Sequence, residues 1–131
     1  MDYQYTINLK VRDYECDLQG IVNNAVYLNY LEHARHQYLL GRNVDFAKLH
    51  DEGIDLIVSR IEIDYKLSLT SGDEFLVGLN VRREGFLRVI FEQEIRRISD
   101  MKLVVKAKVI GVGVKKGKPI KVVDIQGFEY L

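Results

Sequence analysis

The residues best suited to chemistry lie in one short polar stretch, from Cys16 to Asn24. Asp17 carries a carboxylate in a loop that contains Gly20, a few residues before the longest helix that the sequence predicts. The first N–H groups of a helix have no partner within the helix, and together with the helix dipole they favour negative charge. We therefore interpret this stretch as a candidate reaction centre, and no second place in the sequence combines a carboxylate with such donors.

Each of these residues also has a structural interpretation. Asp17 is typical of turns, where its side chain accepts a hydrogen bond from its own loop or caps a helix. Neighbouring side chains of an extended chain point to opposite faces, so we expect Cys16 to be a buried or loop cysteine rather than a nucleophile. Gln19, Asn23 and Asn24 would orient water or substrate, or act only as turn and cap residues.

A long helix is the element that would position this stretch. Helical spacing runs from Ala25 to Leu40, with Asn23 or Asn24 as N-cap and Gly41 at the end. Its apolar face carries three tyrosines whose hydroxyls need partners, namely Tyr27, Tyr30 and Tyr38. A second, short helix is expected over residues 45–52.

The rest of the chain predicts strands. Apolar and polar residues alternate over residues 3–12, 56–67, 75–81, 87–95 and 102–114, and a short last strand is expected over 120–125. The connections between the later strands are short, which predicts antiparallel neighbours. The fold class is therefore α+β, with one long helix on an antiparallel sheet.

The composition limits the classes of function. A chain of 131 residues fits a single domain over residues 1–131, and 19 basic residues balance 19 acidic ones. The formal net charge of +0 argues against a nucleic acid as partner. One cysteine excludes an intrachain disulfide, and the sequence shows neither a signal peptide nor an apolar run long enough to insert into a membrane. We expect a cytoplasmic protein.

Three segments resemble a known family. Residues 17–27, Asp-Leu-Gln-Gly-Ile-Val-Asn-Asn-Ala-Val-Tyr, resemble the D-x-x-G-x-V-N-N-x-x-Y signature of hot-dog-fold acyl thioesterases. Residues 30–35 resemble the Y-x-E-x-A-R pattern that follows it. Residues 49–53, 57–58, 63–65 and 71–73 together resemble the next block of the family. The chain is similar to the 4-hydroxybenzoyl-CoA thioesterase and YbgC-like branch, with features of acyl-carrier-protein thioesterases. Ile21 stands where many relatives have a histidine, which disfavours a histidine-dependent mechanism.

The resemblance implies an antiparallel sheet of five to six strands wrapped around the long helix. It implies hydrolysis of an acyl-CoA or acyl-ACP with no metal and no cofactor except the coenzyme A of the substrate. Asp17 matches the catalytic carboxylate, as nucleophile or general base, and the backbone N–H of Asn24 matches the group that polarises the thioester carbonyl. A homodimer or homotetramer is implied, with active sites at the dimer interface.

Further residues are expected to meet the substrate. Those expected to bind it are Gly20, Val22, Tyr27, Ser59, Arg60, Arg82 and Arg83. The two arginines at 82 and 83 are preferred over the lysines at 115, 116 and 118 as phosphate contacts.

Other charged groups are expected to serve the structure. Glu32 and Arg35 are expected to pair along the helix or to brace the dimer. His33, His36 and His50 lack the spacing of a metal site.

Two other functions fit the same scaffold. A non-catalytic acyl-CoA binding or sensing domain would bind acyl-CoA without turnover. A dehydratase or hydratase would need a histidine paired with a carboxylate, and the loop around Asp17 has no histidine.

Overall fold

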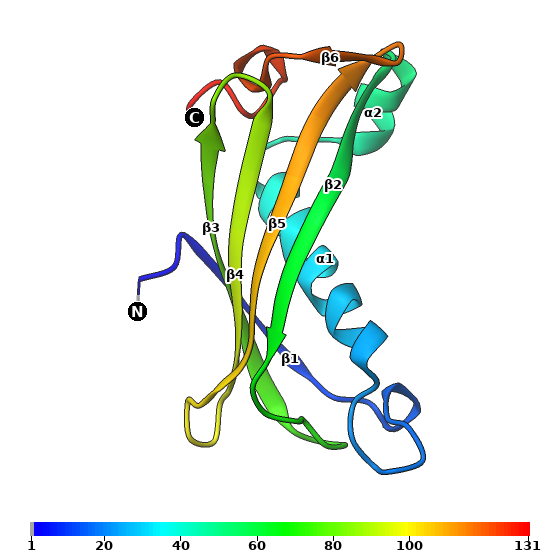
Figure 1. Cartoon of the computed structure of the whole chain (residues 1–131), viewed down its shortest axis with the longest axis vertical. Helices are drawn as coiled ribbons and strands as arrows, with labels where there is room; N and C mark the ends of the chain where they lie inside the picture. Colours follow the sequence, from blue (N-terminus) through cyan, green and yellow to red (C-terminus); the bar gives the residue numbers. More distant parts are fainter. Residues whose placement is uncertain (1) are drawn as a thin grey trace.

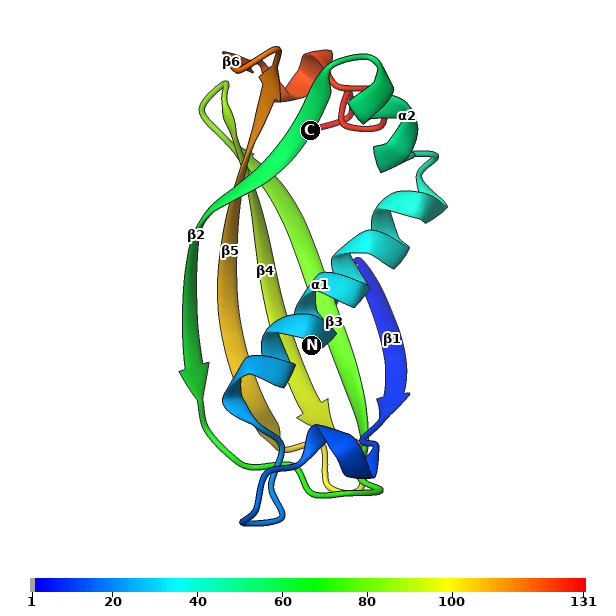
Figure 2. The same ribbon diagram turned by 90° about the vertical axis from the view of Figure 1, so that its right-hand side faces the viewer.

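The computed structural model describes residues 2–131, which form one antiparallel sheet curled around a long helix (Figure 1, Figure 2). The elements are β1 (Tyr5–Lys10), the 3₁₀ turn η1 (Asp13–Glu15), α1 (Asn24–Gly41), α2 (Phe46–Asp51), β2 (Ile54–Tyr65), β3 (Glu74–Glu84), β4 (Arg88–Arg97), β5 (Leu103–Lys115), β6 (Lys118–Ile120) and η2 (Val122–Asp124). The strand order is β1-β3-β4-β5-β2, and β6 pairs with β5. The predicted α+β class is confirmed.

Helix α1 lies on the concave side of the sheet, as Figure 2 shows. Asn23 caps it, because the Asn23 Oδ1 atom accepts a hydrogen bond of 3.0 Å from the N–H of Ala25. The helix ends at Gly41, where the N–H of Arg42 donates to the carbonyl of Leu39. Both ends of the helix therefore follow the signals that the sequence carries. None of the helices in residues 2–131 is both long and apolar enough to cross a membrane.

The three buried tyrosines of α1 all find partners for their hydroxyls. The Tyr27 hydroxyl accepts a hydrogen bond of 3.0 Å from the N–H of Leu69. The Tyr30 hydroxyl donates to Glu15 at 2.8 Å. Tyr38 shares a hydrogen bond of 2.6 Å with the hydroxyl of Tyr130. These bonds attach the helix to three distant segments, so the tyrosines belong to the core and also fix the helix in place.

The neighbour of β2 differs from the prediction. Its pairing partner is β5, with Tyr65 opposite Val105, so β2 lies at the edge of the sheet rather than next to β3. Residues 66–73 are the reason, since they do not form a hairpin. Val22 donates its N–H to the carbonyl of Leu69, and Ile21 forms a bridge with Thr70, so this segment crosses beneath the start of α1 before β3 begins.

The last predicted strand, over residues 120–125, is also wrong. The structure has the short strand β6 followed by the 3₁₀ turn η2. Val122, Ile125 and Phe128 are all fully buried. A spacing of three places them on one side of a helical turn, whereas a strand would alternate them. Gly113 admits the side chain of Ile125, which a Cβ atom on residue 113 would displace.

Candidate active site

A tight turn holds the candidate carboxylate. The N–H of Asp17 donates to the carbonyl of Ile21 at 2.9 Å, and the N–H of Gly20 donates to the carbonyl of Asp17 at 3.0 Å. Gly20 has a φ of +80°, a conformation that side chains with a Cβ rarely adopt, so glycine suits this turn. The Asp17 side chain is exposed, and its Oδ1 atom accepts from the N–H of Gln19 at 2.8 Å. The second carboxylate oxygen has no protein partner among the described residues.

Cys16 and Asp17 point to different environments, as predicted. Cys16 is half-buried and packs against the hydrophobic core, whereas Asp17 is exposed. The structure therefore gives Cys16 a packing role.

The start of α1 keeps one backbone donor free. The N–H groups of Ala25 and Val26 donate to the side chain and the carbonyl of Asn23, respectively. Within residues 2–131, the N–H of Asn24 has no such acceptor. Because the helix dipole also favours negative charge here, this N–H is suited to hold a carbonyl oxygen or an oxyanion.

The buried carboxylate of Glu15 fixes this loop to the helix, and sequence reasoning missed it because its bond to Tyr30 joins two separate elements. The Glu15 carboxylate accepts from the backbone N–H of Arg12 at 2.8 Å, from the Arg12 guanidinium at 2.9 Å and from the Tyr30 hydroxyl at 2.8 Å. Burial of Glu15 opposes its ionisation, but these hydrogen bonds outweigh burial and hold its pKa below the usual range. The backbone carbonyl of Glu15 also accepts from the N–H of Asn23. Glu15 therefore braces both ends of the Asp17 turn.

The other expected site residues fall into two groups. Gln19 and Gly20 are exposed in the turn, while Val22 and Tyr27 are buried directly behind it. Ser59 lies at a bulge in the middle of β2, where its hydroxyl donates to the carbonyl of Ile110 at 3.2 Å. The first group is thus gathered around the Asp17 turn, and Ser59 is distant from it along β2.

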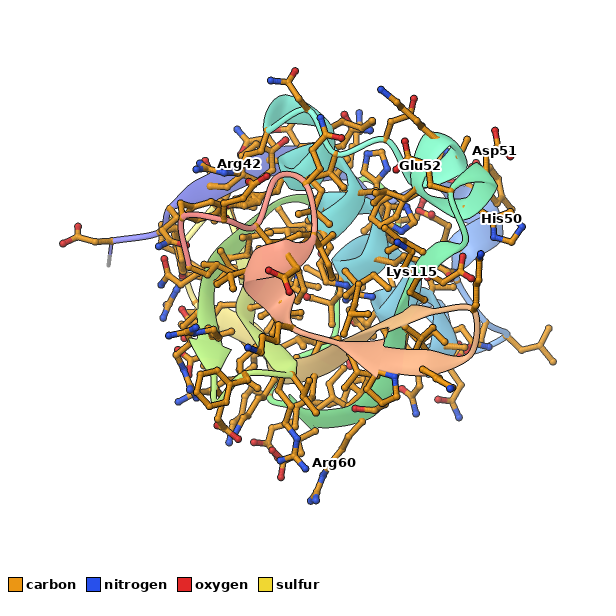
Figure 3. All side chains as sticks on the ribbon, turned by 90° about the horizontal axis from the view of Figure 1, so that it is seen from above. Arg42, His50, Asp51, Glu52, Arg60 and Lys115 are labelled. Carbon is orange, nitrogen blue, oxygen red and sulfur yellow. The ribbon has the colours of Figure 1, made fainter. Side chains whose placement is uncertain are left out.

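The expected phosphate contacts do not reach the Asp17 turn within one chain. Arg82 and Arg83 lie near the end of β3, at the top of Figure 1, whereas the loop before α1 is at the bottom. Arg82 is bonded to Glu92 at 3.2 Å. Arg60 pairs with Glu62 on β2, and Figure 3 shows its side chain extending away from the body of the protein.

The histidines occupy separate positions. His33 and His36 are exposed on α1, and His50 bonds to Asp55 at 2.8 Å. Across residues 2–131, no three His, Cys, Asp or Glu side chains are grouped so as to hold a metal ion.

The expected pairing of Glu32 with Arg35 is replaced by a different contact. The Arg35 guanidinium donates to Oε1 of Gln93 on β4 at 3.0 Å. Arg35 therefore turns inward toward the sheet, because Gln93 offers a buried acceptor that the neighbouring turn of the helix does not.

Comparison with known proteins decides the family. The profile of the "Thioesterase-like superfamily" matches residues 11–127. The chain belongs to this superfamily. It is 33% identical over 119 residues to the acyl-acyl carrier protein thioesterase ATL3, chloroplastic, of Arabidopsis thaliana, an alignment that covers 90% of the chain and 63% of that protein. It is 28% identical over 123 residues to the acyl-CoA thioesterase YbgC of Haemophilus influenzae, covering 92% and 89% of the two chains.

Solved structures of thioesterases share the fold. The structure of Slr0204, a 1,4-dihydroxy-2-naphthoyl-CoA thioesterase from Synechocystis, superposes with a TM-score of 0.86 at 20% identity, over 90% of this chain and 88% of that one. A thioesterase from Thermus thermophilus complexed with coenzyme A and Zn gives a TM-score of 0.81 at 26% identity, over 95% and 94%. The hot-dog fold is confirmed. This thioesterase-like chain spans 63% and 55% of the length of the two Arabidopsis relatives that it matches.

Proposed function

We propose that this protein hydrolyses the thioester of an acyl-CoA or an acyl-ACP to a free acid and a thiol. The observation that carries the proposal is the geometry of one loop. The exposed carboxylate of Asp17 and the unoccupied N–H of Asn24 belong to the same short connection, which Glu15 and Asn23 hold against the start of α1. Membership of the thioesterase-like superfamily supports this chemistry.

In this mechanism the N–H of Asn24 donates to the thioester oxygen, and the helix dipole adds to the stabilisation of the oxyanion. A single oxyanion donor contributes about 3–4 kcal/mol to lowering the barrier. Asn23 and Gln19 act by shaping the loop: the side chain of Asn23 orders the helix start, and the N–H of Gln19 orients the Asp17 carboxylate. Gly20 leaves the approach to the carboxylate open, while Val22 and Tyr27 form the floor behind it.

Asp17 has two routes to the product. In the direct route its carboxylate attacks the carbonyl carbon, the C–S bond breaks and the thiolate leaves, and water then cleaves the mixed anhydride. In the other route Asp17 takes a proton from water, the hydroxide adds to the carbonyl carbon, and the C–S bond breaks as the thiolate takes up a proton. Both routes need the carboxylate and the same donor.

We propose further that a homodimer completes the site. Strand β2 is 12 residues long, and its outer edge has no partner strand among the described residues. Such an edge is a template for pairing with a second copy. Antiparallel pairing of two β2 strands places opposite ends of the two sheets side by side. Arg82 and Arg83 at the partner's upper end then lie nearer to the Asp17 turn than the same residues do within one chain. Together with Arg60 from the middle of β2, they would receive the phosphates of coenzyme A.

The experiment that tests hydrolysis measures thiol release and binding together. Purified protein is incubated with acyl-CoA and acyl-ACP thioesters of several chain lengths, and binding of CoA thioethers of the same chains is measured by calorimetry. Turnover of at least one thioester supports the proposal. Binding without release of thiol from any thioester would instead establish the non-catalytic acyl-CoA binding function.

A further inference from the structure

Arg35 is a buried cation with few partners. Its side chain is only 7% exposed, although it comes from the middle of α1. Among the described residues, its guanidinium makes one hydrogen bond, to the neutral amide oxygen of Gln93. Gln93 is itself 1% exposed and uses its amide N–H to donate to the carbonyl of Leu31. An arginine has five N–H donors, so most of the donors of this one remain available.

The remaining donors reach a pocket. Within residues 2–131, every fully buried polar side-chain atom has a hydrogen-bond partner. The guanidinium nitrogens of Arg35 that have no protein acceptor must therefore keep some accessible surface. That surface opens into a cavity of about 250 Å³ between α1, α2 and the sheet. The cavity is lined mainly by apolar side chains, among them Leu39, Phe46, Leu56, Phe91 and Val109. Glu32 and His36 are its polar rim.

The buried charge of Arg35 is only partly compensated by the protein. Burial lowers the pKa of Arg35, and the charge of Glu32 offsets this only in part. The ring of Phe91 lies 6.0 Å from the guanidinium carbon, which is a weak compensation. Removing a charge from water is costly unless it is paired or hydrogen-bonded. The pocket is therefore matched to a ligand that is apolar along its length and brings an oxygen acceptor to Arg35.

An apolar strip connects this pocket with the Asp17 turn. The strip consists of Val58, Ile61 and Tyr65. Ile61 and Tyr65 lie opposite the core residues Val109 and Val105 of β5, and Val58 lies opposite Gly111 on the same face, so the strip faces the concave side of the sheet. All three are between 37% and 45% exposed. Tyr65 donates its hydroxyl to the carbonyl of Asn24 at 3.3 Å, at the start of α1, and Val58 lines the Arg35 pocket.

The distance selects a particular kind of acyl group. At a rise of 1.5 Å per residue, Arg35 lies about 16 Å along the helix from Asn24, and its side chain leans back toward the N-terminus by about one turn. An acyl group whose carbonyl lies at Asn24 therefore reaches the pocket only if it is of medium or greater length. Edge pairing of β2 with a second copy uses main-chain groups, so it leaves the side chains of the strip as a wall of the channel.

We propose that the pocket above Arg35 binds the distal end of the acyl group, and that this end carries an oxygen acceptor, as a hydroxyl, carbonyl or carboxylate. This inference rests on the proposed function and names the class of substrate. Arg35 is a specificity residue in this account, and it takes no part in breaking the thioester.

The test compares chains that differ only in the distal oxygen. For octanoyl, decanoyl, dodecanoyl and tetradecanoyl chains, kcat/KM is measured for the plain acyl-CoA, the ω-hydroxyacyl-CoA and the ω-carboxyacyl-CoA. Hydrogen bonds to a charged group predict a preference of about tenfold or more for an oxygenated chain over the plain one at one or more lengths. The hydroxyl and carboxylate arms show which acceptor the site prefers, because the exposed Glu32 on the rim opposes an added negative charge.

Variants of Arg35 test whether this residue causes the preference for oxygenated chains. Arg35→Met retains the volume of the side chain and removes the donors, so the ratio of oxygenated to plain substrate falls toward one. Arg35→Lys keeps the charge and retains part of the ratio for the carboxylate. Arg42→Met is the matched control, because Arg42 stacks on Tyr130 outside the pocket, and it keeps the wild-type ratio.

Several results would overturn the inference. It fails if the wild type hydrolyses the plain chains as well as the oxygenated ones at every length, or if Arg35→Met keeps the wild-type ratio. If Arg35→Met does not fold, the wild-type ratio and Arg35→Lys decide. Binding of CoA thioethers with the same distal groups separates this inference from the proposed function. A preference for oxygenated chains in binding, without any turnover, would contradict the proposed hydrolysis and support distal recognition at Arg35. Turnover without such a preference would support hydrolysis and contradict distal recognition at Arg35.

Discussion

The two ends of α1 differ in whether their polar groups have partners within the protein. At its start, the chain forms an exposed polar turn in which Leu18 is fully exposed and the N–H of Asn24 has no acceptor in the described structure. At its end, Tyr38 bonds to Tyr130, and the Arg42 guanidinium stacks on the Tyr130 ring at 3.7 Å. Both ends of the helix are anchored, since Tyr27 and Tyr30 also bond to Leu69 and Glu15 near its start. The comparison shows that the site end differs in leaving polar groups without a partner beside these anchors.

The residues packed around the end of α1 and η2 supply stability, and their disruption is the largest effect that we expect. Phe128 is fully buried in the core beside η2. Phe128→Ala should lower the free energy of unfolding by about 3–5 kcal/mol, because it removes a large side chain and leaves a cavity. Urea unfolding measures this loss. The kcat of the folded fraction should stay near the wild-type value, and a parallel loss of kcat would contradict the division between the two ends.

The Glu15 brace at the start of α1 should respond to acid. Because the pKa of Glu15 is lowered by folding, its contribution is fully present above the ordinary carboxyl pKa and is lost as the pH falls through the folded value. Wild type should therefore lose more stability than Glu15→Gln between neutral pH and about pH 3. Thermal unfolding across this range tests the difference. Equal slopes for the two proteins would show that Glu15 contributes nothing as an ion.

The two helix caps make the smallest and most specific comparison. Asn23 caps α1 at the site, and Asp45 caps α2 at the far end through the N–H groups of Ala47 and Lys48. Asn23→Ala and Asp45→Ala should each cost about 1 kcal/mol of stability. We expect kcat/KM to fall several-fold in Asn23→Ala alone, because that cap orders the N–H of Asn24. Similar kcat/KM values for the two variants would show that the Asn23 cap does not order the N–H of Asn24 for catalysis.

Local patterns in the sequence were enough to predict most elements and the Asp17 loop. Strand alternation and the helix signals at Asn23 and Gly41 act between near neighbours, so they placed the element boundaries within about three residues. The partner of β2 could not be predicted in this way, because it depends on the path of residues 66–73 beneath α1. The inward turn of Arg35 depends on Gln93, which is distant in the sequence.

The last strand was wrong for a related reason. Residues 120–125 contain β-branched side chains that favour a strand locally. In the folded protein their burial is decided by packing against the end of β5, where Gly113 leaves space for Ile125. Tertiary packing therefore selected a 3₁₀ turn over the local preference.

The central claim is that the carboxylate of Asp17 drives hydrolysis, and Asp17→Asn tests it most directly. Asparagine keeps an oxygen that accepts from the N–H of Gln19, so the turn survives while the carboxylate is lost. Asp13→Asn is the matched control, since Asp13 lies in η1 and its Oδ1 atom accepts from Ser71. We predict that thiol release under saturating acyl-CoA falls at least about a hundredfold in Asp17→Asn and stays near wild type in Asp13→Asn. Wild-type turnover by a folded Asp17→Asn protein would contradict the account.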